Sequence, residues 1–506
     1  MSSLKMNDGK ICISICAATA AELFAKIARA EPLADVIELR FDCLRPDEVG
    51  PAMEGIPEIS KTYLLTYRPS EQGGLRVLPN AQRIMFWKNA VKSLAGRDFI
   101  ADHEADLDFP FGFDTGRIIR SHHFFGASPA DLRSVYFELA DVADETVKIA
   151  AACDDITDTI KVWGLLETAA NNDGRVIPIA MGEAGKWTRI LGPAYGAPIT
   201  YAALDEGDET APGQIAASSL IDVFRVKELD RETLVHGIIA GDTTYSVSPW
   251  MHNAAFRAAA MNRVFVPLQV RDLDAFIRRM VRKETREVQL NFAGFSVTNP
   301  HKQAIIPYMD ALDETARDIG AVNTVKVEGD RLIGYNTDAQ GFIAPLNARF
   351  GSLERERVAV AGAGGAARAC VYALKRSGAE VTVFARDVAK ARTLGDEFAV
   401  AVEELSPAGR FTGYDILVDT TPLGTKGETV NQTVAAADQI SGLKLVYDLV
   451  YNPAETRLIH EARQAGVPSI GGLEMLVAQG AAQFEIWTGQ AAPIDAMAEA
   501  VRRKLS

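Results

Sequence analysis

Strand-like hydrophobic runs recur through roughly the first 220 residues, and stretches with a helical period separate them. Eight strands that alternate with helices over this length predict a (β/α)8 barrel. The predicted strands are 10–17, 36–42, 62–68, 99–105, 117–124, 146–152, 176–181 and 198–204.

One face of several predicted strands carries charged or polar side chains, although parallel strands buried on both faces should be apolar throughout. The period of two in a strand separates these polar positions from the apolar ones. If the apolar positions face the helices, the polar positions point into the barrel. These polar positions are Glu38, Arg40, Asp42, Ser121, His123 and Lys148.

A lysine inside a barrel is costly as an ammonium ion, so we expect the pKa of Lys148 to fall and leave a nucleophilic amine. Such an amine forms a Schiff base with a ketone, and the iminium makes the neighbouring C–H acidic. His123 is suited to take that proton, because the ordinary histidine pKa is about 6.5. The pattern indicates a Schiff-base lyase or aldolase. The same residues also fit a lysine that extends its amine to the strand end and a hydrogen-bonding core histidine; the adjacent His122 falls on the helix-facing side and is assigned to packing.

Six motifs in this region, taken in order, resemble those of type I 3-dehydroquinate dehydratases. They are Glu-Leu-Arg-Phe-Asp at 38–42, Thr-Tyr-Arg at 66–68, Ser-His-His at 121–123, Val-Lys-Ile-Ala at 147–150, Thr-Arg-Ile at 188–190 and Ala-Pro-Gly-Gln at 211–214. The resemblance implies that Lys148 forms an imine with the C3 ketone of 3-dehydroquinate. It implies that His123 removes the C2 proton and assists departure of the C1 hydroxyl, and that Arg189 clamps the substrate carboxylate. The other substrate-binding residues that it implies are Glu38, Arg40, Arg68, Thr210 and Gln214.

One pair of residues in this half has a second interpretation, and one position departs from the family pattern. Glu38 and Arg40 also fit a salt bridge inside the barrel without a binding role. The family usually has glutamate before the Gly-Gly of the loop after the third strand, where this chain has Gln72. We therefore expect the histidine base to lack its usual carboxylate partner and to be weaker, unless Glu71 or Glu104 takes that place.

A second set of motifs follows a polar stretch at 226–235 and an apolar run at 236–240. Four loops resemble those of shikimate dehydrogenases: Ser-x-Ser-Pro at 246–249, Asn-Pro-His-Lys at 299–302, Gly-Ala-Val-Asn-Thr at 320–324 and Tyr-Asn-Thr-Asp at 335–338. The resemblance places Lys302 and Asp338 beside the reacting carbonyl, where a lysine paired with a carboxylate protonates the developing alkoxide. Alone, Lys302 also fits a solvated lysine at a helix start. The implied substrate-binding residues are Ser246, Ser248, Thr298, Asn323, Tyr451 and Gln479.

A hydrophobic run at 358–361 leads into a glycine turn and an alanine-rich helix start. In this context a glycine loop binds the pyrophosphate of a dinucleotide. The next predicted strand, 381–384, ends in Ala-Arg-Asp instead of an acid at the ribose position. Arg386 and Lys390 indicate a 2′-phosphate and therefore NADP, whereas Asp387 favours some use of NAD. The predicted cofactor-binding residues are Gly362, Ala363, Gly364, Gly365, Ala366, Arg386, Lys390 and Thr420.

Composition and charge restrict the partners. The formal net charge of −14 gives no electrostatic attraction to nucleic acid or to anionic lipid. The five cysteines contain no Cys-x-x-Cys pair and the seven histidines show no metal-ligand spacing, which predicts a reduced, cytoplasmic protein without a structural metal. We expect no secretion signal and no membrane span, because no run of about 18 apolar residues occurs.

A chain of 506 residues is too long for one hydrophobic core. We predict an α/β protein with a (β/α)8 barrel at 1–226, a linker at 227–235, a substrate-binding domain at 236–345 to which 470–506 returns, and a Rossmann NADP-binding domain at 346–469. The predicted function is dehydration of 3-dehydroquinate to 3-dehydroshikimate, followed by NADPH-dependent reduction to shikimate. The alternatives are a catalytically silent metabolite-sensing regulator built from the same domains and a second half that prefers quinate.

Overall fold

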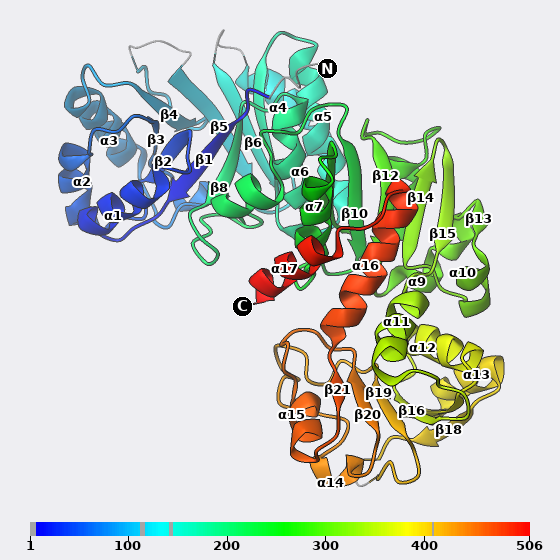
Figure 1. Cartoon of the computed structure of the whole chain (residues 1–506). Helices are drawn as coiled ribbons and strands as arrows, with labels where there is room; N and C mark the ends of the chain where they lie inside the picture. The colour runs from blue at the N-terminus through cyan, green and yellow to red at the C-terminus, as the bar shows by residue number, and fades with distance from the viewer. Residues whose placement is uncertain (1–6, 112–116, 141–144, 407–408, 506) are drawn as a thin grey trace. The chain divides into compact units, whose positions relative to one another are not determined.

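The computed structural model describes residues 7–111, 117–140, 145–406 and 409–505. The chain divides into two compact units (Figure 1). The first unit comprises Met1–Val235, Gly241–Thr244 and Asn262–Asn291. The second unit comprises His236–Ala240, Tyr245–Met261 and Phe292–Ser506.

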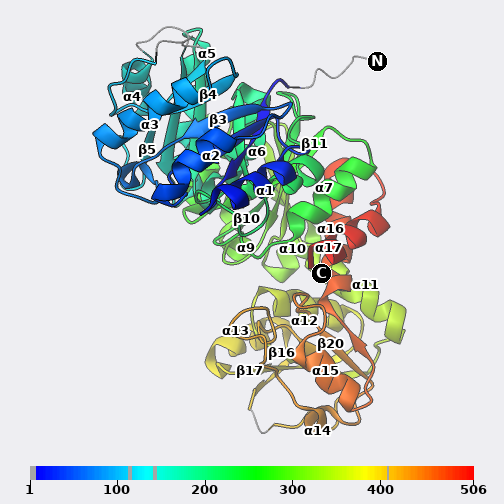
Figure 2. The same cartoon turned by 90° about the vertical axis from the view of Figure 1, so that its left-hand side faces the viewer.

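The first unit is built on parallel strands that alternate with helices, as the hydrophobic pattern predicted. The strands are β1 (Lys10–Ile15), β2 (Val36–Arg40), β3 (Thr62–Thr66), β4 (Phe99–Glu104), β5 (Ile118–Phe124), β6 (Thr146–Ala152), β7 (Arg175–Met181), β8 (Ile199–Ala203) and β9 (Ile215–Ala216). The helices on the outer face of this sheet (Figures 1 and 2) are α1 (Ala20–Ala30), α2 (Val49–Gly55), α3 (Asn80–Ser93), α4 (Leu132–Leu139), α5 (Ile160–Ala170) and α6 (Lys186–Leu191). Residues 262–291 of the unit contain β11 (Arg263–Gln269) and α8 (Leu273–Phe276).

The sheet of the first unit curls around one interior. Its hydrogen-bonded order is β7-β6-β5-β4-β3-β2-β1-β8-β9, yet Lys148 Nζ on β6 lies 4.2 Å from the centroid of the Tyr201 ring on β8. The predicted α/β fold class is confirmed. The sheet differs from a closed barrel in one respect, since β7 is an end of the order: β8 pairs with β1 on one side and with the short β9 on the other.

The interior of this curled sheet is apolar toward the amino ends of the strands and polar toward their carboxyl ends. One buried apolar cluster contains Cys12, Val36, Leu64 and Ile119. Two residues later on the same strand faces come the buried polar side chains of Ser14, Glu38, Thr66 and Ser121. The polar groups therefore gather at the end of the strands where enzymes of the (β/α)8 class place their active sites.

The prediction that all cysteines are reduced is wrong for one pair. Cys16 and Cys43 form a disulfide, with their Cα atoms 5.4 Å apart. Both residues follow the carboxyl ends of β1 and β2, which are neighbouring parallel strands, so the sheet brings the two thiols together. A separation of 27 residues forms no short motif, which explains why the sequence pattern did not reveal the pair. Cys12, Cys153 and Cys370 are free and buried.

The second unit contains two sheets. In the first, β10 (Leu234–Ala240), β12 (Phe292–Val297), β14 (Thr324–Glu328), β15 (Arg331–Tyr335) and β13 (Ala311–Leu312) lie side by side in that order. The second is parallel and has the order β18 (Ala401–Glu404), β17 (Glu380–Ala385), β16 (Arg357–Ala361), β19 (Ile416–Asp419), β20 (Leu445–Asp448) and β21 (Ser469–Ile470). The helices of the unit are α7 (Ser248–Ala258), α9 (His301–Ala304), α10 (Glu314–Ile319), α11 (Asp338–Phe350), α12 (Gly365–Arg376), α13 (Val388–Phe398), α14 (Ala437–Ile440), α15 (Arg457–Gln464), α16 (Gly472–Thr488) and α17 (Ile494–Leu505).

The parallel sheet of the second unit has a hydrophobic core on each face. Val358 and Val360 belong to one core, whereas Ala359 and Ala361 belong to the other. The first strand, β16, is flanked by β17 and β19, so the strand order reverses beside it. Doubly wound sheets bind their ligands at this kind of switch point.

The last two helices leave the parallel sheet. In Figure 1, α16 and α17 form the red end of the chain; α16 packs against α11, and α17 packs against α7. Within the described ranges, every helix is too short or too polar to cross a membrane.

Candidate active sites

The first pocket lies in the first unit, at the carboxyl ends of the strands. Its lining comes from β1, β2, β5, β6, β7, β8, α6, the turn after β3 and the segment between β8 and β9. All the residues predicted for substrate binding and catalysis in this half line it, namely Glu38, Arg40, Arg68, His123, Lys148, Arg189, Thr210 and Gln214. The fold thus brings together side chains that are up to 176 residues apart, from Glu38 to Gln214.

Lys148 is buried in the interior and is only 2% exposed. Its Nζ donates a hydrogen bond of 2.7 Å to Asp102 Oδ2. Burial lowers the pKa of Lys148 below its ordinary value, and the charge of Asp102 only partly offsets this effect. A lower pKa leaves more of the amine in its neutral, nucleophilic form.

Asp102 on β4 organises the cations of this pocket. It accepts hydrogen bonds of 2.5 Å from Arg68 and 2.5 Å from Ser121, in addition to the one from Lys148. Burial raises the pKa of Asp102, but the charges of Arg68 and Lys148 outweigh burial and hold that pKa well below its usual range. Sequence reasoning missed Asp102, although the period of two through 101–104 places it on the same face as Glu104 and would have revealed it.

His123 faces the same pocket from β5. Its backbone N–H donates to Gln72 Oε1 at 2.9 Å, and its Nδ1 is buried with no hydrogen-bond partner among the described residues. Burial, together with the charges of Arg68 and Lys148, lowers the pKa of His123 well below its ordinary value. The imidazole is therefore neutral near pH 7, with one ring nitrogen available to a ligand.

Neither acidic residue considered as a partner for His123 takes that position. Glu71 is exposed. Glu104 accepts hydrogen bonds from Arg68 at 3.3 Å and from Arg83 at 3.1 Å, and burial raises the pKa of Glu104 to about 7. The position of the expected glutamate is thus occupied by the neutral amide of Gln72.

Glu38 and Arg40 do not pair with each other. Glu38 accepts hydrogen bonds from Ser14 and Thr66, the latter at 2.7 Å. Arg40 binds Asp42 through two hydrogen bonds of 2.9 and 2.7 Å. The alternative of a Glu38–Arg40 salt bridge is therefore wrong. Both side chains line the pocket, and each is held by hydrogen bonds to other residues.

Arg189 on α6 has an unused donor in the pocket. The residue is 5% exposed, its NH2 group donates to the Pro212 carbonyl at 3.2 Å, and its buried Nε has no hydrogen-bond partner among the described residues. Burial lowers the pKa of Arg189 to about 10, so the guanidinium stays charged near neutral pH. A buried cation with a free donor suits a carboxylate ligand.

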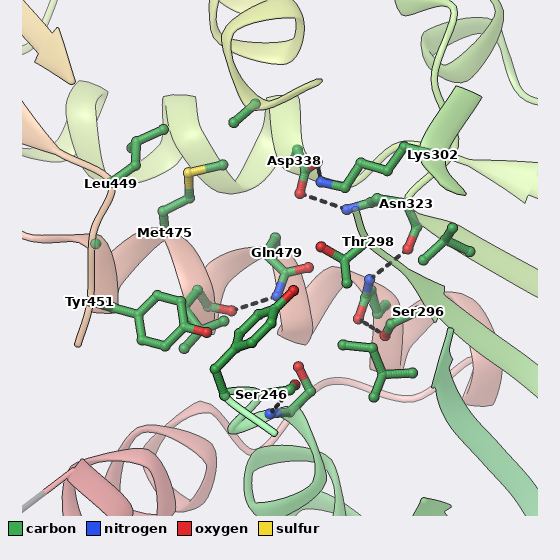
Figure 3. A pocket seen from close by; sticks show the side chains of 18 residues that line it. Ser246, Ser296, Thr298, Lys302, Asn323, Asp338, Leu449, Tyr451, Met475 and Gln479 are labelled. Carbon is green, nitrogen blue, oxygen red and sulfur yellow. Dashed lines mark hydrogen bonds and ion pairs between the residues drawn. The ribbon is translucent and has the colours of Figure 1, made fainter. Parts of the chain in front are cut away.

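The second pocket lies in the second unit (Figure 3). All the substrate-binding and catalytic residues predicted for this half line it, namely Ser246, Ser248, Thr298, Lys302, Asn323, Asp338, Tyr451 and Gln479. Figure 3 shows Lys302, Asn323 and Asp338 together at one end of the pocket and Ser246 at the other. Burial raises the pKa of Tyr451 to about 12, so its hydroxyl keeps its proton and is a donor.

Lys302 and Asp338 form an ion pair with a distance of 2.6 Å, and the Lys302 side chain is 19% exposed. Asn323 Nδ2 donates to the other oxygen of Asp338 at 2.7 Å, and the Thr337 N–H donates to Asn323 Oδ1 at 2.8 Å. The Lys302 side chain is therefore fixed by its ion pair with Asp338, and it is not a freely solvated lysine at a helix start. The amine is fixed next to open space in the pocket.

The sequence places Gln483 one helical turn after Gln479 and on the same face of α16, although Gln483 was not among the predicted site residues. Gln483 Oε1 accepts from Ser296 at 2.7 Å, and its Nε2 donates to the backbone carbonyl of Asn323 at 3.2 Å. Gln483 also lines the pocket. Its helical spacing from Gln479 was the available signal.

The glycine loop after β16 is shaped for a close approach of backbone and ligand. Gly362 has φ of +109°, and a Cβ there would lie 2.3 Å from Thr420 Oγ1. Helix α12 begins at Gly365, and its N-cap, Gly364, gives no side-chain hydrogen bond to the first turn. A Cβ at Gly364 would meet no atom within 4 Å. These residues fit a dinucleotide pyrophosphate, because free N–H groups and open space meet at a helix amino end.

The two cations predicted to recognise a 2′-phosphate, Arg386 and Lys390, are exposed after β17. The carboxylate of Asp387 caps α13 by accepting the Lys390 N–H at 2.9 Å. Asp387 thus has a structural role beside the proposed phosphate site. Among the described residues, no cluster of three or more His, Cys, Asp and Glu side chains is placed to hold a metal ion.

Comparisons with known proteins agree with this division of chemistry. The family model for type I 3-dehydroquinase matches residues 11–231, that for the shikimate dehydrogenase substrate binding domain matches 238–325, and that for the shikimate 5′-dehydrogenase C-terminal domain matches 472–502. A solved structure of a shikimate dehydrogenase in complex with NADP+ has 35% sequence identity and a TM-score of 0.51, covering 55% of this chain and 98% of that chain.

Two curated relatives extend the match. A shikimate dehydrogenase (NADP(+)) of Methanothermobacter thermautotrophicus is 38% identical over 288 residues, which is 54% of this chain and 98% of the relative. The chloroplastic bifunctional 3-dehydroquinate dehydratase/shikimate dehydrogenase of Arabidopsis thaliana is 32% identical over 519 residues, which is 96% of this chain and 83% of the relative. Because the similarity to the Arabidopsis enzyme runs through both units, this chain belongs to the family of bifunctional 3-dehydroquinate dehydratase/shikimate dehydrogenases.

Proposed function

We propose that the first unit dehydrates 3-dehydroquinate through an imine on Lys148, and that the second unit reduces the product, 3-dehydroshikimate, beside Lys302 and Asp338. The observation that carries the proposal is the buried amine of Lys148. It shares one pocket with His123 Nδ1 and Arg189 Nε, neither of which has a hydrogen-bond partner in the described part of the chain. A regulator without catalysis would not need a lysine held in a low-dielectric interior at a cost in stability.

In the first pocket, the neutral amine of Lys148 attacks the C3 ketone, and loss of water with uptake of one proton from solvent leaves a protonated imine. His123 then takes a proton from C2, which forms an enamine, and returns that proton to the C1 hydroxyl as the C1–O bond breaks. Water hydrolyses the conjugated imine, which frees the product and restores the amine. Asp102 stabilises each cationic form of Lys148 through their hydrogen bond of 2.7 Å.

The remaining residues of the first pocket bind and orient the substrate. The free Nε of Arg189 is the donor for the substrate carboxylate. Glu38, Arg40, Arg68, Thr210 and Gln214 are assigned to the hydroxyl groups and the carboxylate. Because Glu38, Arg40 and Arg68 are each fixed by other side chains, they are positioned before the substrate arrives.

In the second pocket, the ammonium of Lys302 gives a proton to the oxygen of the substrate ketone as it gains negative charge, and Asp338 holds that ammonium in place. Ser246 and Ser248 are assigned to the substrate carboxylate. Thr298, Asn323, Tyr451 and Gln479 are assigned to the ring hydroxyls.

We assign NADP(H) to the glycine loop after β16. Gly362, Ala363, Gly364, Gly365, Ala366 and Thr420 would hold its pyrophosphate and nicotinamide ends, and Arg386 with Lys390 would hold its 2′-phosphate. When bound there, NADPH supplies the hydride. No catalytic step is assigned to a metal ion.

The proposed domains are a barrel at 1–226, a linker at 227–235, a substrate-binding domain at 236–345 with 470–506, and a Rossmann NADP-binding domain at 346–469. The expected partners are 3-dehydroquinate, 3-dehydroshikimate and shikimate, without nucleic acid or membrane. The cytoplasmic location also stays a prediction, and the similar Arabidopsis protein is named as chloroplastic.

A coupled assay tests the proposed function. The purified chain is mixed with 3-dehydroquinate and NADPH, and NADPH absorbance and product mass are followed. We expect NADPH to be oxidised and shikimate to form without any added enzyme. NADH should be slower by at least about tenfold in kcat/KM, which corresponds to about one hydrogen bond to a charged group.

The outcomes of this assay separate the two halves. NADPH oxidation that requires added 3-dehydroshikimate contradicts the role of the first unit. Faster oxidation of quinate than of shikimate with NADP+ supports the alternative substrate for the second unit. Absence of both reactions supports the silent regulator.

Gln72→Glu should strengthen the base in the first pocket. The new carboxylate can keep the hydrogen bond from the backbone N–H of His123, now 2.9 Å long to Gln72 Oε1, and it adds a negative charge to the pocket that both residues line. A nearby negative charge raises a histidine pKa. We expect the acid limb of the dehydratase pH profile to move up by about one unit and kcat near pH 8 to rise.

The control for this change is Glu71→Gln, at the exposed neighbouring position. It alters the charge of the same loop without facing the pocket, and it should leave the pH profile in place. An unchanged acid limb in Gln72→Glu would show that residue 72 does not tune the base.

A further inference from the structure

Two buried aspartates lie side by side at the carboxyl edge of the parallel sheet. Neither is among the catalytic residues assigned to the two pockets. Asp419 ends β19 and Asp448 ends β20, and the register of these strands pairs one residue with the other. Both side chains are 0% exposed. Two adjacent carboxylates away from water cannot both be ionised cheaply.

The hydrogen bonds of the pair are unequal. Asp448 accepts two, one from the Val450 N–H at 2.9 Å and one from the Thr456 hydroxyl. Asp419 Oδ1 accepts the Thr421 N–H at 2.8 Å, whereas its buried Oδ2 has no partner among the described residues. Asp448 is therefore the carboxyl with donors for a negative charge, and Asp419 is the one that needs a proton.

The described residues around the two aspartates supply no positive charge that would stabilise an ionised Asp419. Burial and the charge of Asp448 raise the pKa of Asp419 well above its ordinary value, and only the Thr421 N–H and hydroxyl act against them. Burial raises the pKa of Asp448 to about 6, against the hydrogen bonds from Thr456 and Val450. In the described part of the chain, no lysine, arginine or histidine acts on either carboxyl.

Both aspartates hold backbone that reaches the second pocket. The residues next to Asp448 on its loop include Leu449 and Tyr451, which line the pocket (Figure 3). Asp419 holds the turn that contains Thr420, whose hydroxyl donates to the Ala361 carbonyl at 2.7 Å beside the glycine loop. The pair therefore joins two loops of the dehydrogenase site.

We propose that Asp419 is a neutral carboxylic acid at neutral pH, that it and the ionised Asp448 fix the loops after β19 and β20, and that loss of this proton in alkaline solution loosens them. The proposal rests on the assignment of the second pocket to the dehydrogenase reaction. Asp419 and Asp448 are positioning residues in this account, because neither lines the pocket.

A buried acid that is neutral in the folded chain makes the stability depend on pH with a definite sign. An acid whose pKa is raised on folding removes stability as the pH rises from its unfolded pKa, about 3.9, toward its folded pKa. Asp419→Asn has nearly the same shape and keeps a donor, but it carries no charge at any pH. The stability of the variant relative to that of the wild type should therefore increase as the pH rises.

The test measures Tm of the full-length chain by calorimetry and kcat/KM for shikimate at each pH from 5 to 9. We expect the Tm difference between Asp419→Asn and the wild type to grow by about 5 °C or more between pH 5 and pH 7. The ratio of kcat/KM for the variant to that for the wild type should rise toward pH 9. Asp396→Asn, at an exposed position on α13, is the matched control and should show neither trend.

A second variant keeps the test decisive if Asp419→Asn does not fold. Asp448→Asn removes the neighbouring charge, so its Tm should depend less on pH than that of the wild type, even if it is lower throughout because one donor loses its acceptor. A Tm difference that is constant with pH overturns the proposal. A growing Tm difference with a constant kinetic ratio overturns the positioning role. A wild-type chain that does not oxidise shikimate refutes the proposed function, while the Tm series still tests the pair.

Discussion

Replacement of Lys148 by methionine should lower the dehydratase kcat by about a thousandfold or more, equivalent to roughly 4 kcal/mol of transition-state stabilisation. Methionine keeps most of the buried stem, and it loses the contact of the Lys148 Nζ with the Tyr201 ring. What is lost is the amine, and with it the covalent route through an imine on Lys148. Arg68 still neutralises Asp102 in the variant, through their contact of 2.5 Å.

Trapping identifies the nucleophile directly. Borohydride added with 3-dehydroquinate should reduce the imine to a stable amine, and mass spectrometry of peptides should place the added mass on Lys148. Lys92→Met, at an exposed position on α3, is the matched control and should trap as the wild type does. Label on any other lysine, or dehydratase activity that survives in Lys148→Met, contradicts the covalent mechanism.

The bifunctional chain provides its own control for this variant. Dehydrogenase activity with added 3-dehydroshikimate should be unchanged in Lys148→Met, because Lys148 lies in the first unit. A loss of both activities would indicate misfolding and not a lost nucleophile. The comparison of two activities in one sample also removes errors in enzyme concentration.

The period of two in the first half carried most of the information about the fold and the first pocket. Apolar and polar positions alternate in 36–42 and 146–149, which allowed the inward face to be predicted without a structure, and Lys148 and Glu38 are buried there. The Lys148 amine is buried and bound to Asp102, which favours the chemical interpretation over a lysine that extends its amine to the strand end. The resemblance to known motifs then fixed which ketone it attacks.

Features that depend on pairing between distant strands were not predictable in this way. Asp102 meets Lys148 across two strand pairings, and Cys16 meets Cys43 across one. The open edge at β7 depends on the two-residue strand β9, which is too short to give a periodic signal. Local alternation specifies the face of a strand, whereas these contacts depend on the register between strands.

The pair Asp419 and Asp448 shows the same limit in the second half. Each aspartate ends a short hydrophobic strand and reads as an ordinary strand-end residue in the sequence. Only the parallel register of β19 and β20 places the two carboxyls together. The unfavourable contact between two buried carboxyls therefore follows from the register of the strands, and the sequence alone does not predict it.

The second large effect is expected for Lys302→Ala, which should lower the kcat of NADPH-dependent reduction by about a hundredfold to a thousandfold. Among the described residues, Lys302 is the one cation that forms an ion pair with Asp338, and its amine faces the pocket (Figure 3). Without it, the developing alkoxide must take its proton from water, which is a poor acid near neutral pH. Asp338 keeps its hydrogen bond from Asn323 at 2.7 Å, so the loop should stay in place.

The measurement separates a chemical role from a binding role. In Lys302→Ala we expect binding of NADP+ to be retained, KM for 3-dehydroshikimate to change far less than kcat, and dehydratase activity to match the wild type. Lys426→Ala, at an exposed position in the same unit, should keep both activities. Full dehydrogenase activity in Lys302→Ala would remove this lysine from the mechanism, because a proton donor in contact with the reacting oxygen cannot be lost without a change in rate.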